Sequence, residues 1–257
     1  MIGAAAVVIA ATGCRDDSRR DAVETYIQSV NRAQARLEPA MRDAQQALRE
    51  FASGRVTPTT AERLRGGSAT MRATQASLAR IEPPQEARAL HDDLLRLVDL
   101  QSGLALQLSL AADYVTRVGP AVQPAQQAAA RLGRELRSAG SGGQQATALR
   151  EFAASVDDSL RRIDLLAPPP ALVPWHDDQR KRLAKSREDE LALATGIEER
   201  NAGAVNRALK AFTTRPPESA TRASQAAAIK AFNRRLQQQE RLLARIAREQ
   251  TALAGVG

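Results

Sequence analysis

Apolar residues recur at alternating spacings of three and four along most of the chain, the pattern of a helix with one buried face. The first stripe runs from Val23 to Phe51 and stops before Gly54, a common helix terminator. Pro39 lies inside this stripe and is expected to kink the single helix or to cost it a hydrogen bond. Six further stripes, separated by glycine or proline breaks, have apolar positions over 64–81, 90–118, 125–136, 149–163, 175–212 and 229–253 and predict six more helices. The first of these is expected to start at Thr57-Pro58, with Thr57 as its N-cap.

The composition supports helices throughout. Ala, Leu, Gln, Arg and Glu dominate the chain, and these residues lose little free energy on entering a helix. Aromatic residues make up only 3%, and the runs of β-branched residues that strands favour are scarce. Since spacings of three and four suit helices packed nearly side by side, we predict an all-α fold, an elongated helical bundle of about seven helices.

A short motif occurs twice. Two prolines, a histidine and two aspartates recur without gaps at an offset of 85 residues, and they include both histidines of the chain. The two copies are Pro83, Pro84, His91, Asp92 and Asp93, and Pro168, Pro169, His176, Asp177 and Asp178. We infer a duplicated three-helix unit followed by a C-terminal helix. The expected segments are a signal peptide over 1–13, a tether over 14–20, repeats over 21–119 and 120–215, and a basic amphipathic helix over 216–257.

The N-terminal segment carries the only cysteine. Ile2 to Gly13 are uncharged and apolar or small, a length typical of the apolar core of a signal peptide and too short to span a bilayer. Ala11-Thr12-Gly13-Cys14 resembles the lipobox of bacterial lipoproteins. This resemblance implies cleavage before Cys14, a diacylglycerol and acyl anchor on its thiol and amine, and a position at the cell membrane on its extracytoplasmic face. The alternative is an N-terminus in which the cysteine is incidental.

The formal net charge of +8 favours polyanionic partners. Nucleic acid is not expected, because the chain has neither aromatic stacking platforms nor a known nucleic-acid motif. Anionic lipid, an acidic envelope polymer or an envelope protein remain as candidates. The final predicted helix concentrates basic residues, and these are the candidate contacts to an anionic surface: Lys230, Arg234, Arg235, Arg241, Arg245 and Arg248. The alternative is a solvated outer face.

The repeated His-Asp-Asp motif allows two interpretations. Aspartates near the start of a helix interact favourably with its dipole, so capping and packing explain the motif without a ligand. If the two repeats converge, His91 and Asp92 with His176 and Asp177 form a candidate metal or small-ligand site, since zinc accepts imidazole and carboxylate together. Trp175, the only tryptophan, precedes the second copy and is expected to fill a core position.

No catalytic constellation is recognisable. The two histidines belong to the duplicated motif, and no glycine-rich phosphate loop follows a strand. The sequence therefore favours a non-enzymatic, lipid-anchored binding or scaffold protein of the bacterial envelope, with no cofactor besides the acyl anchor at Cys14. The alternative is a lipoprotein that binds a metal or small ligand through the two His-Asp-Asp motifs.

Overall fold

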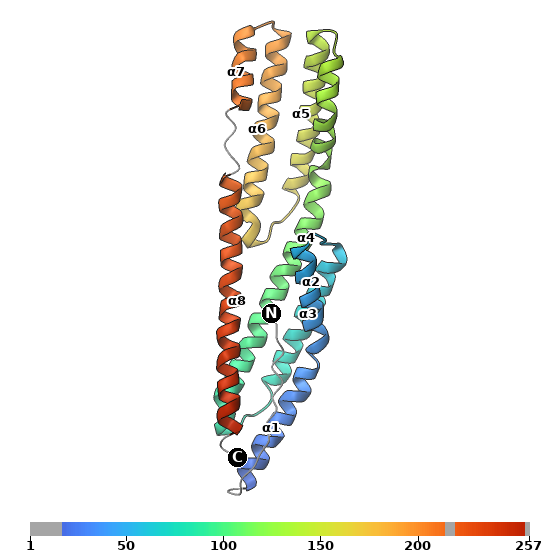
Figure 1. Ribbon diagram of the computed structural model, residues 1–257. Coiled ribbons are helices and arrows are strands. Elements are labelled where there is room, and N and C mark those ends of the chain that lie inside the picture. Colours follow the sequence, from blue (N-terminus) through green and yellow to red (C-terminus); the bar gives the residue numbers. More distant parts are fainter. Residues whose placement is uncertain (1–16, 214–218, 255–257) are drawn as a thin grey trace. The chain divides into compact units, whose positions relative to one another are not determined.

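The computed structural model describes residues 17–213 and 219–254, and every regular element in these ranges is helical (Figure 1). The predicted all-α helical bundle is confirmed for these residues. Cys14 and the predicted signal peptide over 1–13 lie outside them. The elements are α1 (Asp17–Ala35), α2 (Glu38–Ala52), α3 (Pro58–Leu78), the short 3₁₀ helix η1 (Gln85–Ala87), α4 (Arg88–Ser138), α5 (Gly142–Asp164), the 3₁₀ helix η2 (Pro170–Leu172), α6 (Val173–Glu198), α7 (Ala202–Thr213) and α8 (Ser219–Ala254).

The chain forms two compact units. The first unit combines Met1–Asp113 with Lys230–Gly257, and the second unit is Tyr114–Ile229. The division falls within α4, and α8 contributes its residues from Lys230 onward to the first unit. Each unit therefore has its own set of packed helices and its own core.

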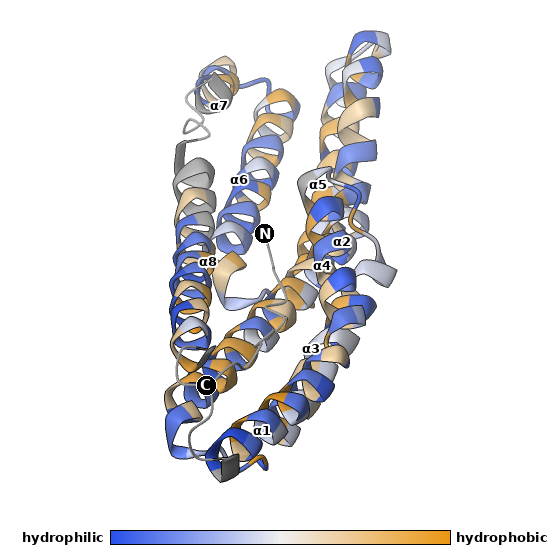
Figure 2. Cartoon of the chain, turned by 60° about the horizontal axis from the view of Figure 1, so that its bottom comes forward, coloured by the Kyte–Doolittle hydropathy of each residue, from blue (hydrophilic) through white to orange (hydrophobic). Residues whose placement is uncertain are grey.

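The first unit buries the predicted apolar stripes of α1, α2, α3, α4 and α8. Figure 2 shows apolar residues running in bands along the helices between hydrophilic stretches. The most completely buried side chains of this core include Val30, Leu64, Met71, Leu90 and Ile246, each at most 1% exposed. Because they come from four different helices, the core joins segments at opposite ends of the sequence.

The second unit has three smaller apolar clusters instead of one continuous core. Phe152 and Val156 of α5 pack with alanines of α4, and Ile163 packs with Tyr114. Leu149 packs with Leu193 of α6 and with α7. Small alanine side chains at these contacts allow helix backbones to approach closely, which suits a unit with few aromatic residues.

α4 is one helix where two were predicted. The prediction of a break at Gly119-Pro120, followed by a separate helix over 125–136, is wrong, because α4 continues through Pro120 and Pro124. Its buried face runs uninterrupted across both prolines. Ala125 donates its backbone N–H to Ser159 Oγ at 3.0 Å, so a side chain of α5 satisfies a donor next to Pro124. Packing and this hydrogen bond offset the usual cost of proline in a helix.

The first predicted stripe forms two helices. The prediction of a single helix, with a kink or a lost hydrogen bond at Pro39, is wrong: α1 ends at Ala35 and α2 starts at Glu38. Pro39 then occupies the first turn of α2, where a missing N–H costs nothing. α2 ends at Ala52, and Gly54 just beyond it adopts a left-handed φ of +67°. The prediction that Gly54 terminates this stripe is confirmed.

The predicted long helix over 175–212 is also two helices, so that prediction is wrong. α6 ends at Glu198, and Arg200 adopts a left-handed φ of +53°. Asn201 then caps α7, because its Oδ1 accepts the backbone N–H of Ala204 at 3.0 Å. Gly196 permits the close return of α7, since a Cβ there would lie 3.1 Å from the backbone nitrogen of Val205.

The order of elements repeats at the offset seen in the sequence. η1 and η2 start at residues 85 and 170, and the helices that follow them start at Arg88 and Val173. Both 3₁₀ helices come directly after a proline, Pro84 or Pro169, in extended conformation. In both copies, therefore, a proline pair ends one helix and a short turn starts the helix that carries the His-Asp-Asp motif.

Candidate functional site

His91 and Tyr26 form a buried pair in the first unit. His91 lies one turn into α4 and is 5% exposed, and Tyr26 of α1 is 3% exposed. The tyrosine hydroxyl and His91 Nδ1 are 3.3 Å apart, within hydrogen-bond distance. Burial lowers the pKa of His91 against the opposing charge of Asp92, and burial raises the pKa of Tyr26. Both rings are therefore neutral at pH 7, since the effect of burial on each pKa is larger than that of Asp92 for His91 and has the same sign for Tyr26.

His176 and Tyr114 form the corresponding pair in the second unit. The Tyr114 hydroxyl lies 2.8 Å from His176 Nδ1, and His176 is 6% exposed. Trp175 packs edge-on against Tyr114 with ring centroids 5.9 Å apart, so this tryptophan is half-buried against the core. Burial, with a smaller contribution from Asp177, raises the pKa of Tyr114 to about 12. Each unit thus joins its only histidine to its only tyrosine.

The candidate metal ligands do not gather within either unit. His91 lies in the first unit and His176 in the second, and both rings are directed at tyrosines. Asp92 and Asp177, adjacent to the histidines, are exposed. Within residues 17–213 and 219–254, no group of three or more His, Cys, Asp or Glu side chains is placed to hold a metal ion. The hydrogen bonds to tyrosine give the histidines a packing role, and the metal hypothesis gains no support from these contacts.

The second aspartate of the motif differs between the copies. The Asp93 side chain is 4% exposed and forms a two-point ion pair with Arg245 of α8, with Nη2 to Oδ1 at 2.7 Å and a close Nε to Oδ2 contact. Arg96 Nη1 lies 3.2 Å from the same Oδ1. Asp178 instead pairs with Arg182 one turn along its own helix, at 3.1 Å. The first copy therefore binds a distant helix through its aspartate.

The predicted basic residues of the last helix divide into two groups. Arg245 is committed to Asp93, and Arg235 is half-buried. The others are exposed: Lys230, Arg234, Arg241 and Arg248. Among the described contacts of these six residues, Arg245 alone forms an ion pair. Arg245 is also exposed at the surface, as the sequence predicts, but its guanidinium is held by the buried Asp93 carboxylate.

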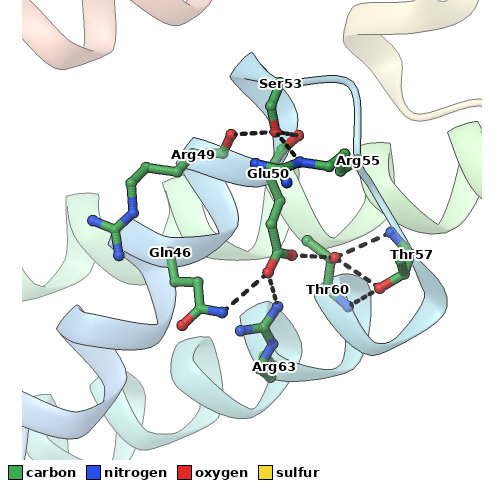
Figure 3. Close-up of polar contacts among 8 residues, drawn as sticks. All are labelled: Gln46, Arg49, Glu50, Ser53, Arg55, Thr57, Thr60 and Arg63. Carbon is green, nitrogen blue, oxygen red and sulfur yellow. Dashed lines mark hydrogen bonds and ion pairs between the residues drawn. The ribbon is translucent and has the colours of Figure 1, made fainter.

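A third polar cluster joins α2 to α3 (Figure 3). The Glu50 carboxylate accepts hydrogen bonds from the hydroxyl of Thr60, the guanidinium of Arg63 and the amide of Gln46. The hydrogen bonds from Thr60 and then Arg63 lower the pKa of Glu50 to about 2. Thr60 also completes a capping box with Thr57 at the start of α3. The cluster is internal to one helix junction, and we assign it a structural role.

The first unit has a shallow hollow of about 380 Å³ beside Tyr26. It lies between α1 and the segment after α3. Its lining combines apolar Ile81 with the carboxylates of Asp21 and Glu82. Such a hollow is too open to enclose a small molecule, since ligand pockets cover most of their ligand.

Comparison of the chain with protein-family models, with curated proteins and with solved structures finds no match. Within the part of the chain that the structure describes, no helix has the length and apolar character needed to cross a bilayer. Inference about function therefore depends on the residues themselves.

Proposed function

We propose that this chain is a lipid-anchored, extracytoplasmic binding or scaffold protein of a bacterial envelope, attached to the membrane through Cys14. The observation that carries the proposal is the position of the only cysteine, directly after twelve uncharged small or apolar residues. A diacylated cysteine followed by basic residues such as Arg15, Arg19 and Arg20 combines two membrane signals, which is what stable anchoring requires.

The described residues are consistent with a role in binding instead of catalysis. A histidine that acts as a general base needs a ring nitrogen directed at substrate, whereas His91 and His176 are buried and each contacts a tyrosine hydroxyl. The remaining candidate surfaces are helical faces. α1 begins at Asp17, three residues after Cys14, so an acylated cysteine would hold the first unit within about 10 Å of the membrane surface.

Metabolic labelling with palmitate in a bacterial host tests the proposal. The wild-type chain is expected to incorporate label and to sediment with membranes, and Cys14→Ala is expected to lose both properties. Thr12→Ala serves as the matched control, because it keeps a small residue before the cysteine and should be labelled normally. Equal labelling of wild type and Cys14→Ala, or no labelling of either, would refute the anchor.

A further inference from the structure

Four exposed basic residues of α8 lie on one narrow face. With 100° of rotation per residue, Lys230, Arg234, Arg241 and Arg248 fall within an arc of about 40°. At 1.5 Å per residue, they extend over about 27 Å along the helix. We call these four residues the basic face. Gln237 and Ala244, which lie between them on the same side, are also exposed.

The basic face is turned away from the first unit. The buried residues Leu242, Ile246 and Leu253 lie on the opposite side of α8, roughly 100–180° around the helix from the basic face. Arg245 lies at the edge of the arc and is held by Asp93, which fixes the rotation of the helix. The hydrophilic surface of α8 is visible in Figure 2. The four side chains are thus presented together by a helix that cannot turn freely.

The basic face has few carboxylates beside it. Within the described part of the chain, no carboxylate lies within ion-pair distance of the four residues. Glu249 is the nearest acidic position to the arc, about a sixth of a turn away, and this half-buried carboxylate interacts electrostatically with Arg248. Four positive charges in a line with one such carboxylate beside them attract a polyanion.

We propose that the basic face binds the anionic headgroups of a phospholipid bilayer, with α8 lying parallel to its surface. This inference rests on the proposed function, because the anchor places the first unit at a membrane. The first turn of α1 and the last turns of α8 lie at the same end of this unit (Figure 1, Figure 2). The Tyr26–His91 and Asp93–Arg245 contacts link those two helices through the start of α4. An acyl chain on Cys14 and the basic face can therefore meet one surface.

A planar lipid surface fits this face better than nucleic acid does. The face is straight, and it contains no aromatic side chain on which a base would stack. Each basic residue near an anionic bilayer adds to the affinity, and the contributions decay within a Debye length. Four residues presented together over about 27 Å can all approach a plane at the same time.

Vesicle binding by the full chain carrying Cys14→Ser tests the inference without acylation. The protein is mixed with vesicles of equal parts phosphatidylglycerol and phosphatidylcholine, or of phosphatidylcholine alone, and bound protein is measured by sedimentation. The basic-face variant combines Lys230→Gln, Arg234→Gln, Arg241→Gln and Arg248→Gln. The control variant removes the same charge from exposed positions elsewhere in the first unit: Arg36→Gln, Arg65→Gln, Arg80→Gln and Arg88→Gln.

The basic-face variant is expected to bind the anionic vesicles about 100-fold more weakly than the parent chain, while the control loses less than about fivefold. A variant with lysine at positions 234, 241 and 248 keeps the charge and should bind like the parent chain. About 0.5 M salt should abolish the binding of the parent chain. Equal binding of both variants, equal binding to phosphatidylcholine alone, or tighter binding to duplex DNA at matched phosphate overturns the inference. Because this chain is not acylated, failure here is distinguishable from failure of palmitate labelling.

Discussion

The two copies of the His-Asp-Asp motif share the contact made by the histidine and differ in the contact made by the second aspartate. In both copies the histidine is buried and its Nδ1 contacts a tyrosine hydroxyl, at 3.3 Å in the first unit and 2.8 Å in the second. In the first copy Asp93 is buried against Arg245 of the last helix. In the second copy Asp178 pairs within its own helix, with Arg182. The histidine–tyrosine contact, which both copies share, is internal packing. The ion pair of the second aspartate differs, because each unit offers it different helices.

The contact of Asp93 indicates how α8 packs into the first unit. Arg245 lies 152 residues after Asp93, and its guanidinium meets both carboxylate oxygens. A buried carboxylate that loses its partner is strongly destabilising, so the aspartate specifies how α8 docks. Docking in this rotation is also what exposes the basic face. In the first copy of the motif, the second aspartate therefore connects α4 to the last helix.

The largest expected effect comes from removing Arg245. Arg245→Met should lower the free energy of unfolding by about 2–4 kcal/mol, because it leaves Asp93 buried with only Arg96 beside it. The ion pair of Arg182 with Asp178 should contribute at most about 1 kcal/mol, since it lies within one helix and is partly exposed, so Arg182→Met should cost less than Arg245→Met. Urea unfolding measures both losses. Arg241→Met is the matched control on α8, and equal losses for Arg245 and Arg182 would contradict the comparison.

A smaller effect, equal in the two copies, is expected from the tyrosines. Tyr26→Phe and Tyr114→Phe retain the ring but remove the hydroxyl that meets the histidine. Each should lower the free energy of unfolding by about 1–2 kcal/mol, because a buried Nδ1 loses its partner. Thermal and urea unfolding measure the effect. A loss below about 0.5 kcal/mol in one copy would show that the two pairs are not equivalent.

Acidification should destabilise the first unit through His91. Its pKa in the folded chain is lowered by burial from the ordinary value of 6.5, so the unfolded chain takes up a proton first as the pH falls. The free energy of unfolding therefore decreases below pH 6.5, with a slope of at most about 1.4 kcal/mol per pH unit from one group. His91→Gln should flatten this part of the profile. An unchanged slope in His91→Gln would exclude the histidine as its source.

The smallest expected difference is between the N-terminal caps of α3 and α5. Thr57 caps α3 within a reciprocal capping box, and Ser141 caps α5 by accepting the backbone N–H of Gln144. Thr57→Ala should cost about 1 kcal/mol and Ser141→Ala about 0.5 kcal/mol. Differential scanning calorimetry measures both. Serine at position 57 is the control, because it preserves the cap, and a larger loss for Ser141→Ala would reverse the expected order.

Much of the fold was predictable because helix formation here follows the local spacing of apolar residues. The errors occur where distant contacts decide the outcome. Gly119-Pro120 was expected to end a helix, but the buried stripe of α4 continues and Ser159 accepts a hydrogen bond from the backbone of α4. The turn at Arg200 contains neither glycine nor proline, and the one local signal for a helix start there, the favoured N-cap residue Asn201, was missed.

The candidate site was predictable only in part. Repetition at a fixed offset singled out His91 and His176, yet their tyrosine partners lie 65 and 62 residues away and follow a different offset. Sequence patterns do not report such pairings. The presence of only two tyrosines and two histidines was the available signal for a paired arrangement. No feature of the sequence predicted the ion pair between Asp93 and Arg245, since a single arginine on a helix with many basic residues is expected to be solvated.

Mass spectrometry of the mature N-terminus is the sharpest test of attachment to a membrane through Cys14. The chain is expressed in a bacterial host and purified from its membrane fraction, and its N-terminal peptide is analysed after proteolysis. We expect a peptide that begins at Cys14 and carries the mass of a diacylglycerol with or without a further acyl chain. An unmodified Cys14 within a peptide that retains the preceding residues would refute the anchor.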